Sequence, residues 1–464
     1  MKATVIVVGL CLALRLLLVG LAAPWTPAAE HALIGDSDPR GYHLLATRLI
    51  QGKGYLANEP DRPMPEGVLA RSYPGEPEAL WPPGYPAFLA LGYTLFGIRL
   101  TPVILLQIVW ATLGCYWIMH ATARLWTPRA GVMAGLLCAL EPVSILTSHR
   151  ILSEAIFLPW LSLGVYVLAR VLTAPTARAR FIGLTLLAVV FGVASYTRVS
   201  AQPLFIALLV GLAVHTWLSQ QSVKAAAWSA LWAALVFLLV LSPWCWRNYR
   251  LFGVWAFSTS GAYNLLAGFE YRGDKDAMFH KAYLAAVSAG VDPARLNPFE
   301  RARFWRETAL TEWRADASGN LRLYFKRLLV MMLTPSVSDW GRLLRLPLPQ
   351  TDTANKTVGQ IIREFFAKTT TPIGLIGVYS LLFTGLFYAL CAWGALCLPR
   401  LSEAGARAYI GIALFTAMFS ILTTIVMSDA RGRMPAMMLL MPVAGAALAA
   451  VWEAGTIRLC RRSR

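Results

Sequence analysis

Long apolar stretches alternate with short polar turns along most of the chain. A helix that crosses a membrane needs about 20 mostly apolar residues. Ten stretches meet this requirement, at residues 3–23, 99–122, 130–148, 152–172, 180–198, 201–219, 225–246, 373–397, 408–428 and 434–453. The pattern therefore predicts an all-α polytopic membrane protein with about ten transmembrane helices, within a range of about 10–13.

The first stretch also has features of a secretory signal peptide, because Lys2 precedes it and Ala22-Ala23 follows it. Its apolar run is long for a signal peptide, and the later spans need a first anchor. We therefore expect residues 3–23 to be retained as a membrane helix.

The spans divide the chain into six parts. We expect a first transmembrane helix at 1–23, an extracytoplasmic loop at 24–98 (loop one), and transmembrane helices two to seven within 99–246. A second extracytoplasmic loop (loop two) follows at 247–372, then the last three transmembrane helices at 373–453 and a basic cytoplasmic tail at 454–464.

Both loops contain segments with helical periodicity. In loop one, Tyr42, Leu45, Ala46 and Leu49 form one apolar face, which predicts an interfacial helix over residues 39–51. Residues 84–97 are apolar but too short to span, and predict a second interfacial helix. In loop two we expect helices at 299–314, 319–333 and 357–368, and the apolar end of 319–333 could re-enter the membrane.

Positive charge sets the orientation. With the N-terminus in the cytoplasm, the cytoplasmic side holds thirteen Lys and Arg residues: Lys2, Arg124, Arg129, Arg170, Arg178, Arg180, Lys224, Arg400, Arg407, Arg458, Arg461, Arg462 and Arg464. The short outer turns hold four: Arg150, Arg198, Arg431 and Arg433. The positive-inside rule therefore predicts that both termini are cytoplasmic and both long loops extracytoplasmic, in a cell membrane.

Composition agrees with the apolar pattern. The chain is 57% hydrophobic and only 14% charged, with a mean hydropathy of +0.56, whereas soluble domains carry about 25% charged residues. These values exclude soluble, fibrous and disordered classes. The net charge of +18 would suggest nucleic acid in a soluble protein, but here cytoplasmic Lys and Arg explain it, and we expect no nucleic-acid partner.

Several kinds of site have no sequence signature here. Seven Cys occur, without a CxxC pair, so neither a disulfide framework nor a zinc site is supported. No dinucleotide-binding glycine fingerprint, Walker A loop or G-x-S-x-G motif occurs. The candidate chemistry is therefore a matter of charged residues near the membrane surface.

Acidic residues lie at two outer positions. Asp36 and Asp38 stand just before the predicted interfacial helix, where a carboxylate could act as a general base toward a hydroxyl nucleophile. Asp38, followed by Pro39, is equally suited to cap that helix. Glu154 opens a span, either as a first-turn carboxylate favoured by the helix dipole or as a functional group at membrane depth.

Arginines gather at the same predicted face. Arg198, Arg247, Arg431 and Arg433 end or begin spans on the outer side, against the charge rule. Arginine binds phosphate through two parallel hydrogen bonds, although each could instead reach toward lipid head groups. The pattern favours an anionic ligand. His149 and Arg150 extend this polar cluster, with His149 the weaker candidate.

Four segments together resemble the GT-C glycosyltransferases, most closely the branch of protein O-mannosyltransferases and lipid A aminoarabinose transferases. They are Asp38-Pro39-Arg40-Gly41-Tyr42 with Gly52-Lys53-Gly54-Tyr55; Trp81-Pro82-Pro83-Gly84-Tyr85-Pro86; Leu152-Ser153-Glu154 with Phe157; and Ser242-Pro243-Trp244 with Arg247-Asn248-Tyr249. A weaker fifth is Arg431-Gly432-Arg433-Met434-Pro435. The likeness covers residues 1–270 and 373–453, whereas residues 271–372 match no motif.

The resemblance implies a function. It implies a membrane glycosyltransferase that moves a sugar from a polyprenyl-phosphate donor to a hydroxyl or phosphate acceptor on a lipid, glycan or protein, at the outer face and with inversion. Asp38 then corresponds to the catalytic base, with Asp36 as its near alternative and Glu154 as the second acidic position. Arg433 is the first candidate for the donor phosphate, ahead of Arg431, Arg198 and Arg247, and Tyr42 and Tyr85 are substrate-binding candidates.

Two other classes remain open from the sequence. A flippase or transporter for a lipid-linked sugar would also have many spans, although transporter sites usually lie near the bilayer midplane. A surface-polysaccharide polymerase or ligase would share the donor. No cofactor is indicated with certainty; a divalent cation held by Asp36, Asp38 and Glu154 is left open.

Overall fold

The fold is helical throughout the part of the chain that the structure describes. The computed structural model describes residues 2–35, 38–57, 67–269, 276–346, 360, 371–424 and 429–462. Within these ranges it contains 19 α-helices and no strand. The prediction of an all-α polytopic membrane protein is confirmed, and Asp36 lies outside the described residues.

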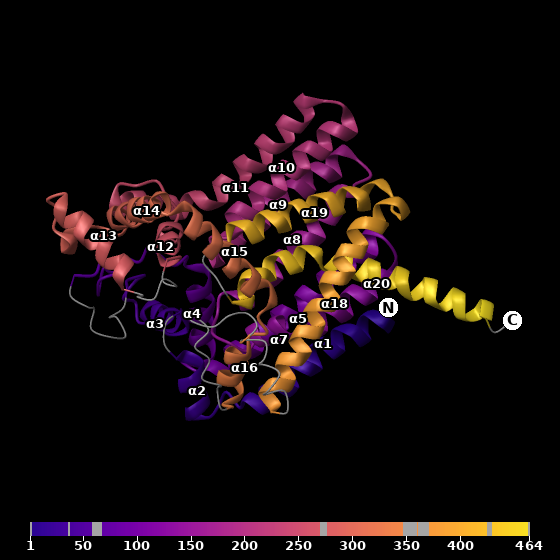
Figure 1. The fold of residues 1–464 in the computed structure, drawn as a ribbon, viewed down its shortest axis with the longest axis horizontal. Helices are drawn as coiled ribbons and strands as arrows, with labels where there is room; N and C mark the ends of the chain where they lie inside the picture. The colour runs from indigo at the N-terminus through magenta and orange to yellow at the C-terminus, as the bar shows by residue number, and fades with distance from the viewer. Residues whose placement is uncertain are drawn as a thin grey trace.

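Nine helices in the described ranges are long and apolar enough to cross a membrane. They are α1 (Lys2–Ala22), α5 (Leu100–Leu125), α8 (Glu154–Leu172), α9 (Ala177–Thr197), α10 (Ala201–Gln220), α11 (Val223–Phe252), α18 (Pro372–Leu401), α19 (Ala404–Thr423) and α20 (Met434–Arg462), the last extended by the short helix η3 (Ala430–Arg433). They form one bundle, and both chain termini lie at the same end of it (Figure 1).

The span expected at 130–148 is two shorter helices, α6 (Pro128–Leu140) and α7 (Pro142–Thr147). Proline at 142 cannot continue the hydrogen bonding of α6, and the freed polar groups find partners inside the protein. The buried Glu141 carboxylate accepts from the Ser144 amide, Arg15 donates to the Ala139 carbonyl and the Ser144 hydroxyl, and Tyr379 donates to the Leu140 carbonyl.

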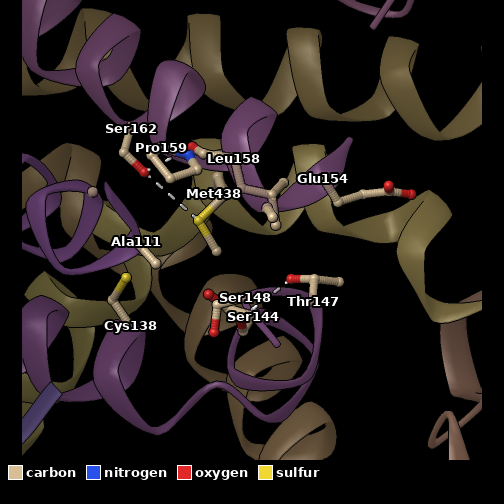
Figure 2. A pocket seen from close by; sticks show the side chains of 12 residues that line it. Ala111, Cys138, Ser144, Thr147, Ser148, Glu154, Leu158, Pro159, Ser162 and Met438 are labelled. Atoms are coloured by element: carbon tan, nitrogen blue, oxygen red, sulfur yellow. Dashed lines mark hydrogen bonds between the residues drawn. The ribbon is translucent and has the colours of Figure 1, made fainter. Parts of the chain in front are cut away.

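A small cavity adjoins this break. Figure 2 shows Ser144, Thr147 and Ser148 on one side of the cavity and Met438 of α20 on the other, with Glu154 at the edge of the cavity. A broken helix at membrane depth is tolerated only where protein satisfies its backbone. The contacts of Arg15 explain why a charged residue can occur inside the first span.

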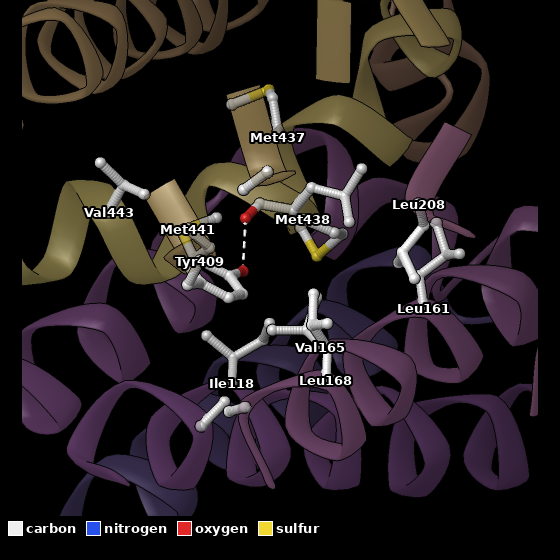
Figure 3. Close-up of a cluster of buried hydrophobic side chains, with 14 of the residues drawn as sticks. Ile118, Leu161, Val165, Leu168, Leu208, Tyr409, Met437, Met438, Met441 and Val443 are labelled. Atoms are coloured by element: carbon white, nitrogen blue, oxygen red, sulfur yellow. Dashed lines mark hydrogen bonds between the residues drawn. The ribbon is translucent and has the colours of Figure 1, made fainter. Parts of the chain in front are cut away.

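The centre of the bundle is a packed apolar core. Figure 3 shows Leu161, Val165 and Leu168 of α8 facing Met438 and Met441 of α20. In the same region, the buried Tyr409 hydroxyl donates to the Leu439 carbonyl at 2.6 Å. A core of this kind fixes α20 against α8, so the residues at the N-terminal ends of these two helices keep a defined spacing.

Loop one forms three short helices: α2 (Pro27–Ile34), α3 (Asp38–Ile50) and α4 (Gly84–Phe96). Helices predicted at 39–51 and 84–97 are therefore observed within one or two residues. Loop two contains α12 (Ser260–Ala267), α13 (Ala277–Ser288), η2 (Pro293–Arg295), α14 (Pro298–Ala315), α15 (Ala317–Leu333) and α16 (Val337–Leu344). Helices predicted at 299–314 and 319–333 are thus confirmed, while 357–368 lies outside the described residues except for position 360.

Loop two is connected to the bundle by polar contacts, one of them buried. Arg150, in the turn before α8, forms an ion pair with Asp339 of α16, and Arg345 donates to the Thr26 hydroxyl at 3.0 Å and the Ala22 carbonyl at 3.3 Å. These contacts place α16 beside the ends of α1 and α7.

Candidate active site

Glu154, the first residue of α8, is buried and lies at the centre of a charged cluster. Nη1 of Arg198 lies 2.6 Å from Oε1 of Glu154, and Nη1 of Arg431 lies 3.7 Å from the same oxygen. Arg198 follows the last residue of α9 and Arg431 belongs to η3, so three separate helix ends meet here. Two of the arginines expected from the sequence to face an anion are therefore brought together with the expected second acidic residue.

Asp429 completes the cluster. Its side chain accepts from the Arg431 backbone amide and from Nε of Arg431, each at 2.8 Å, and Nη2 of Arg431 lies 2.8 Å from Oδ2. Burial alone would raise the pKa of the Asp429 carboxyl, but the Arg431 charge and these hydrogen bonds lower it below the ordinary value. Two carboxylates and two guanidinium groups thus hold each other in fixed positions.

Helix α3 borders the cluster. The hydroxyl of Ser153 accepts from Nη1 of Arg198 at 3.1 Å and from the Tyr42 hydroxyl at 3.5 Å. Asp38, half-buried in the first turn of α3, lies near enough for its negative charge to act on both Tyr42 and Arg431. Burial, with Asp38 adding to it, raises the pKa of the Tyr42 phenol well above its ordinary value, so Tyr42 stays a hydrogen-bond donor.

Aromatic packing holds α3 in this position. The Tyr42 ring lies 5.2 Å from the Trp81 ring and 5.0 Å from the Tyr85 ring, centroid to centroid. The buried Tyr85 hydroxyl donates to Oε1 of Gln107 in α5 at 2.8 Å. Gly41 allows this arrangement, because a Cβ atom there would overlap the Trp81 indole. Tyr42 and Tyr85, both site candidates from the sequence, therefore pack against each other, with Tyr42 one turn along α3 from Asp38.

Arg433 does not contact this cluster. Its side chain is buried, and Nη1 donates to the carbonyls of Met331 and Met332 at 3.0 Å and of Thr334 at 2.8 Å, while Nη2 donates to the Thr384 hydroxyl at 3.2 Å. The first candidate for the donor phosphate thus lies against the C-terminal end of α15. Its phosphate-binding role stays a prediction.

The remaining candidates have partners elsewhere. The His149 ring nitrogens lie 2.8 Å from the carbonyl oxygens of Ile145 and Arg15, and burial lowers the His149 pKa to about 4. Arg150 pairs with Asp339. Arg247 donates to the Glu78 carbonyl at 2.7 Å and lies over the Trp244 ring, 4.5 Å from its centroid. These contacts connect loops to helix ends.

Two residues of the cluster were not among the sequence candidates, Asp429 and Ser153. The signal for Asp429 was its place two residues before Arg431 in an outer turn, a spacing that lets a carboxylate accept from the backbone amide. Ser153 appears in the sequence only within the segment Leu152-Ser153-Glu154, yet its hydroxyl accepts from Nη1 of Arg198 and lies 3.5 Å from the Tyr42 hydroxyl.

The charged residues determine which ions the cluster can hold. In the described part of the chain, no group of three or more His, Cys, Asp or Glu side chains is arranged to bind a metal. Glu154, one of the three possible metal ligands from the sequence, faces two guanidinium groups instead, and Asp36 is outside the described residues. The arrangement is suited to an anion that approaches Arg198 and Arg431 from the exposed side.

The fold has counterparts among solved structures. The chain is similar to the archaeal oligosaccharyltransferase AglB from Archaeoglobus fulgidus in complex with an inhibitory peptide and a dolichol-phosphate, with a TM-score of 0.55 at 14% identity, over 100% of this chain and 51% of that one. The structure of the oligosaccharyltransferase from Archaeoglobus fulgidus in the apo form is similar as well. Its TM-score is 0.53 at 14% sequence identity, over 100% of this chain and 52% of that one. The chain thus spans about half the length of these structures.

A more distant similarity is to ArnT from Cupriavidus metallidurans bound to undecaprenyl phosphate, with a TM-score of 0.39 at 14% identity, over 94% of this chain and 77% of that one. This value is too low to support any inference. A comparison with curated protein sequences found no match.

The bundle defines an integral membrane protein with several spanning helices, and its fold is similar to that of the archaeal oligosaccharyltransferase structures. Residues 81–246 match the sequence profile of the dolichyl-phosphate-mannose-protein mannosyltransferase family. The matched segment is less than half of the chain. The segment includes Trp81, Tyr85, Glu154 and Arg198, and therefore two of the four charged residues of the cluster around Glu154.

Proposed function

We propose that this protein is a glycosyltransferase that moves a sugar from a polyprenyl-phosphate donor to an acceptor hydroxyl at the outer face of the membrane. The observation that carries this proposal is the charged cluster of Arg198, Arg431 and Asp429 around the buried Glu154, with Asp38 beside it. The family match of residues 81–246 supports the same reaction class.

Arg198 and Arg431 bind the donor phosphate in this proposal. Their side chains are each 19% exposed, so their guanidinium groups are partly accessible while Glu154 and Asp429 hold them in position. Charge grows on the phosphate oxygen as the bond from the sugar's anomeric carbon breaks. Fixed guanidinium groups at this point stabilise that charge without having to reorganise.

Asp38 is the general base. The acceptor hydroxyl attacks the anomeric carbon from the face opposite the phosphate, and its proton passes to the Asp38 carboxylate as the new carbon–oxygen bond forms. The polyprenyl phosphate leaves with the electron pair of the broken bond. This single displacement inverts the anomeric centre and needs only the chain's own side chains. Loop two, adjacent to the site through α15 and α16, recognises the acceptor.

Asp38→Asn tests this proposal. Asparagine supports a helix start about as well as aspartate, but it cannot accept the proton. A general base contributes about 10²- to 10⁴-fold in rate, so turnover with a polyprenyl-phosphate sugar in membrane vesicles should fall at least about 100-fold while expression stays normal. Asp292→Asn is the matched control, because Asp292 caps η2 from an exposed position.

Asp36→Asn is measured in parallel. Near-normal turnover of Asp38→Asn together with an inactive Asp36→Asn would identify Asp36 as the base. If both variants remain active, the proposed reaction is wrong.

A further inference from the structure

Helix α15 of loop two carries an apolar stripe that no other described element covers. Leu321, Phe325, Leu329 and Leu333 recur every four residues, and each side chain is about half exposed (46–54%). The only charged residues of α15 are Arg322, Lys326 and Arg327, all in its first eleven positions. The final six residues, from Leu328 to Leu333, are apolar without exception.

The C-terminal end of α15 contacts α18 far along that span. Thr384 and Tyr388 lie 12 and 16 residues after Pro372, or about 18 and 24 Å along the helix at 1.5 Å per residue. Tyr388 donates to the Met332 carbonyl at 2.9 Å. Because α18 is apolar and long enough to cross a membrane, this contact lies within the apolar part of a spanning helix.

The last carbonyl groups of α15 are satisfied by protein side chains. Arg433 donates to the carbonyls of Met331, Met332 and Thr334, and Tyr388 shares the second of them. A helix that ended in water would leave these carbonyls to solvent. In hydrocarbon each unsatisfied backbone group costs several kcal/mol, and a helix end is tolerated there only with such partners.

The apolar stripe also continues the surface of the neighbouring spans. Tyr324 donates to the Leu422 carbonyl in the last turn of α19 at 3.0 Å, and Leu422 and Met418 of α19 are exposed. On α18, Leu382 and Leu386 are exposed as well. Figure 1 shows α15 beside one end of α19 and on the bundle side of α12–α14.

We propose that α15 is a half-inserted helix. Its C-terminal half lies in the membrane leaflet at this end of the bundle, with Phe325, Leu329 and Leu333 against lipid acyl chains. Arg322 and Lys326, on the same exposed side nearer the N-terminal end, meet the phosphate head groups. The partner of this surface is the bilayer itself, and loop two is thereby attached to the membrane between its flanking spans.

Spin-label accessibility in liposomes tests the insertion. Cysteines replace Leu329 or Phe325 in the full chain, after Cys397 and Cys460 are changed to Ser to remove competing thiols. Leu284→Cys on α13 is the matched control, because Leu284 and Leu329 are both 49% exposed. Leu382→Cys on α18 is the lipid reference. Molecular oxygen concentrates in lipid, whereas a polar nickel chelate stays in water.

Labels at Leu329 and Phe325 should collide with oxygen more often than with the nickel chelate, as at Leu382, and the label at Leu284 should show the reverse. Two positions are used so that one poorly folded variant does not decide the result. Chelate accessibility at Leu329 and Phe325 equal to that at Leu284 would overturn the proposal. Low accessibility to both reagents would also overturn it, since a protein partner would then cover the stripe.

Discussion

Arg431 and Arg433 are two positions apart in η3 but contact different parts of the molecule. Arg431 lies between Glu154 and Asp429, with its side chain partly exposed. Arg433 is buried among carbonyl groups at the end of α15. A short helix that presents alternate residues to opposite sides can therefore join the charged cluster to loop two.

This difference predicts separate effects of substitution. Arg431→Ala should reduce turnover about 100-fold or more, as for the loss of a hydrogen-bond donor to a developing charge, with a near-normal melting temperature. Arg431→Lys should retain only part of the wild-type turnover, because lysine lacks the planar guanidinium that forms two parallel hydrogen bonds. Arg433→Ala should lower the free energy of unfolding by at least about 3 kcal/mol, because three backbone carbonyls lose their donor in an apolar setting.

Steady-state kinetics and thermal unfolding in detergent measure both effects. Arg250→Ala is the matched control, since Arg250 lies exposed on α11 with its guanidinium 5.9 Å from the Trp246 ring centroid. A fully stable Arg433→Ala protein with a raised donor KM would support the phosphate-binding role that the sequence predicts for Arg433 and contradict the separation drawn here.

The sequence predicted residue types and approximate positions better than it predicted partners. Glu154, Arg198 and Arg431 were expected as charged residues at helix ends, because each breaks a local expectation for a membrane helix end. The distinction between Arg431 and Arg433 could not be foreseen, since it depends on where α15 ends in space. The role of Asp429 likewise depends on the η3 turn and not on any motif.

At the scale of elements, α3 is positioned by close packing around one glycine. Gly41 faces the indole of Trp81, which in turn contacts Tyr42 and lies under the Arg71 guanidinium at 4.0 Å. The periodicity of 39–51 predicted the helix but not this contact, because Trp81 lies 40 positions away in the chain.

Gly41→Ala tests whether this packing positions Asp38. The added methyl group must displace the indole or tilt α3, and a shift of about 1 Å at a reacting group can cost up to about 100-fold in rate. We expect kcat to fall by about 10- to 100-fold, while the protein still folds. Gly20→Ala in α1 is the control, because a Cβ atom there meets no neighbour within 4 Å. Equal activity of the two variants would show that α3 tolerates the change.

The α6–α7 pair shows what hydropathy alone cannot resolve. Residues 130–148 are apolar enough to suggest one span, and Pro142 was the visible sign of an interruption. The contacts that make the interruption tolerable come from Arg15 and Tyr379, on helices far away in sequence. Length and mean hydropathy describe a segment in isolation, whereas a broken span depends on its neighbours.

At the scale of the whole molecule, the order of the helices gives each a direction through the bundle. Glu154 begins α8, Arg198 follows α9 and Arg431 precedes α20, and all three meet at one end. For α5 and α8 to run in the same direction, the α6–α7 pair must complete a crossing between them. Nine long helices with this pair therefore make ten crossings, which agrees with the two termini lying at one end of the bundle (Figure 1).

This arrangement and the thirteen-to-four distribution of Lys and Arg predict that the end with both termini is cytoplasmic. Labelling of intact cells with a membrane-impermeant maleimide tests the prediction, in the background that lacks Cys397 and Cys460. Glu307→Cys, at an exposed position of α14, should react from outside, whereas Arg461→Cys in the basic tail should react only after lysis. Reaction of Arg461→Cys in intact cells would invert the topology and move the Glu154 cluster to the cytoplasmic face. A sugar donor that faces the outside could then not reach it, so this measurement also bears on the proposed reaction, independently of any substitution in the site.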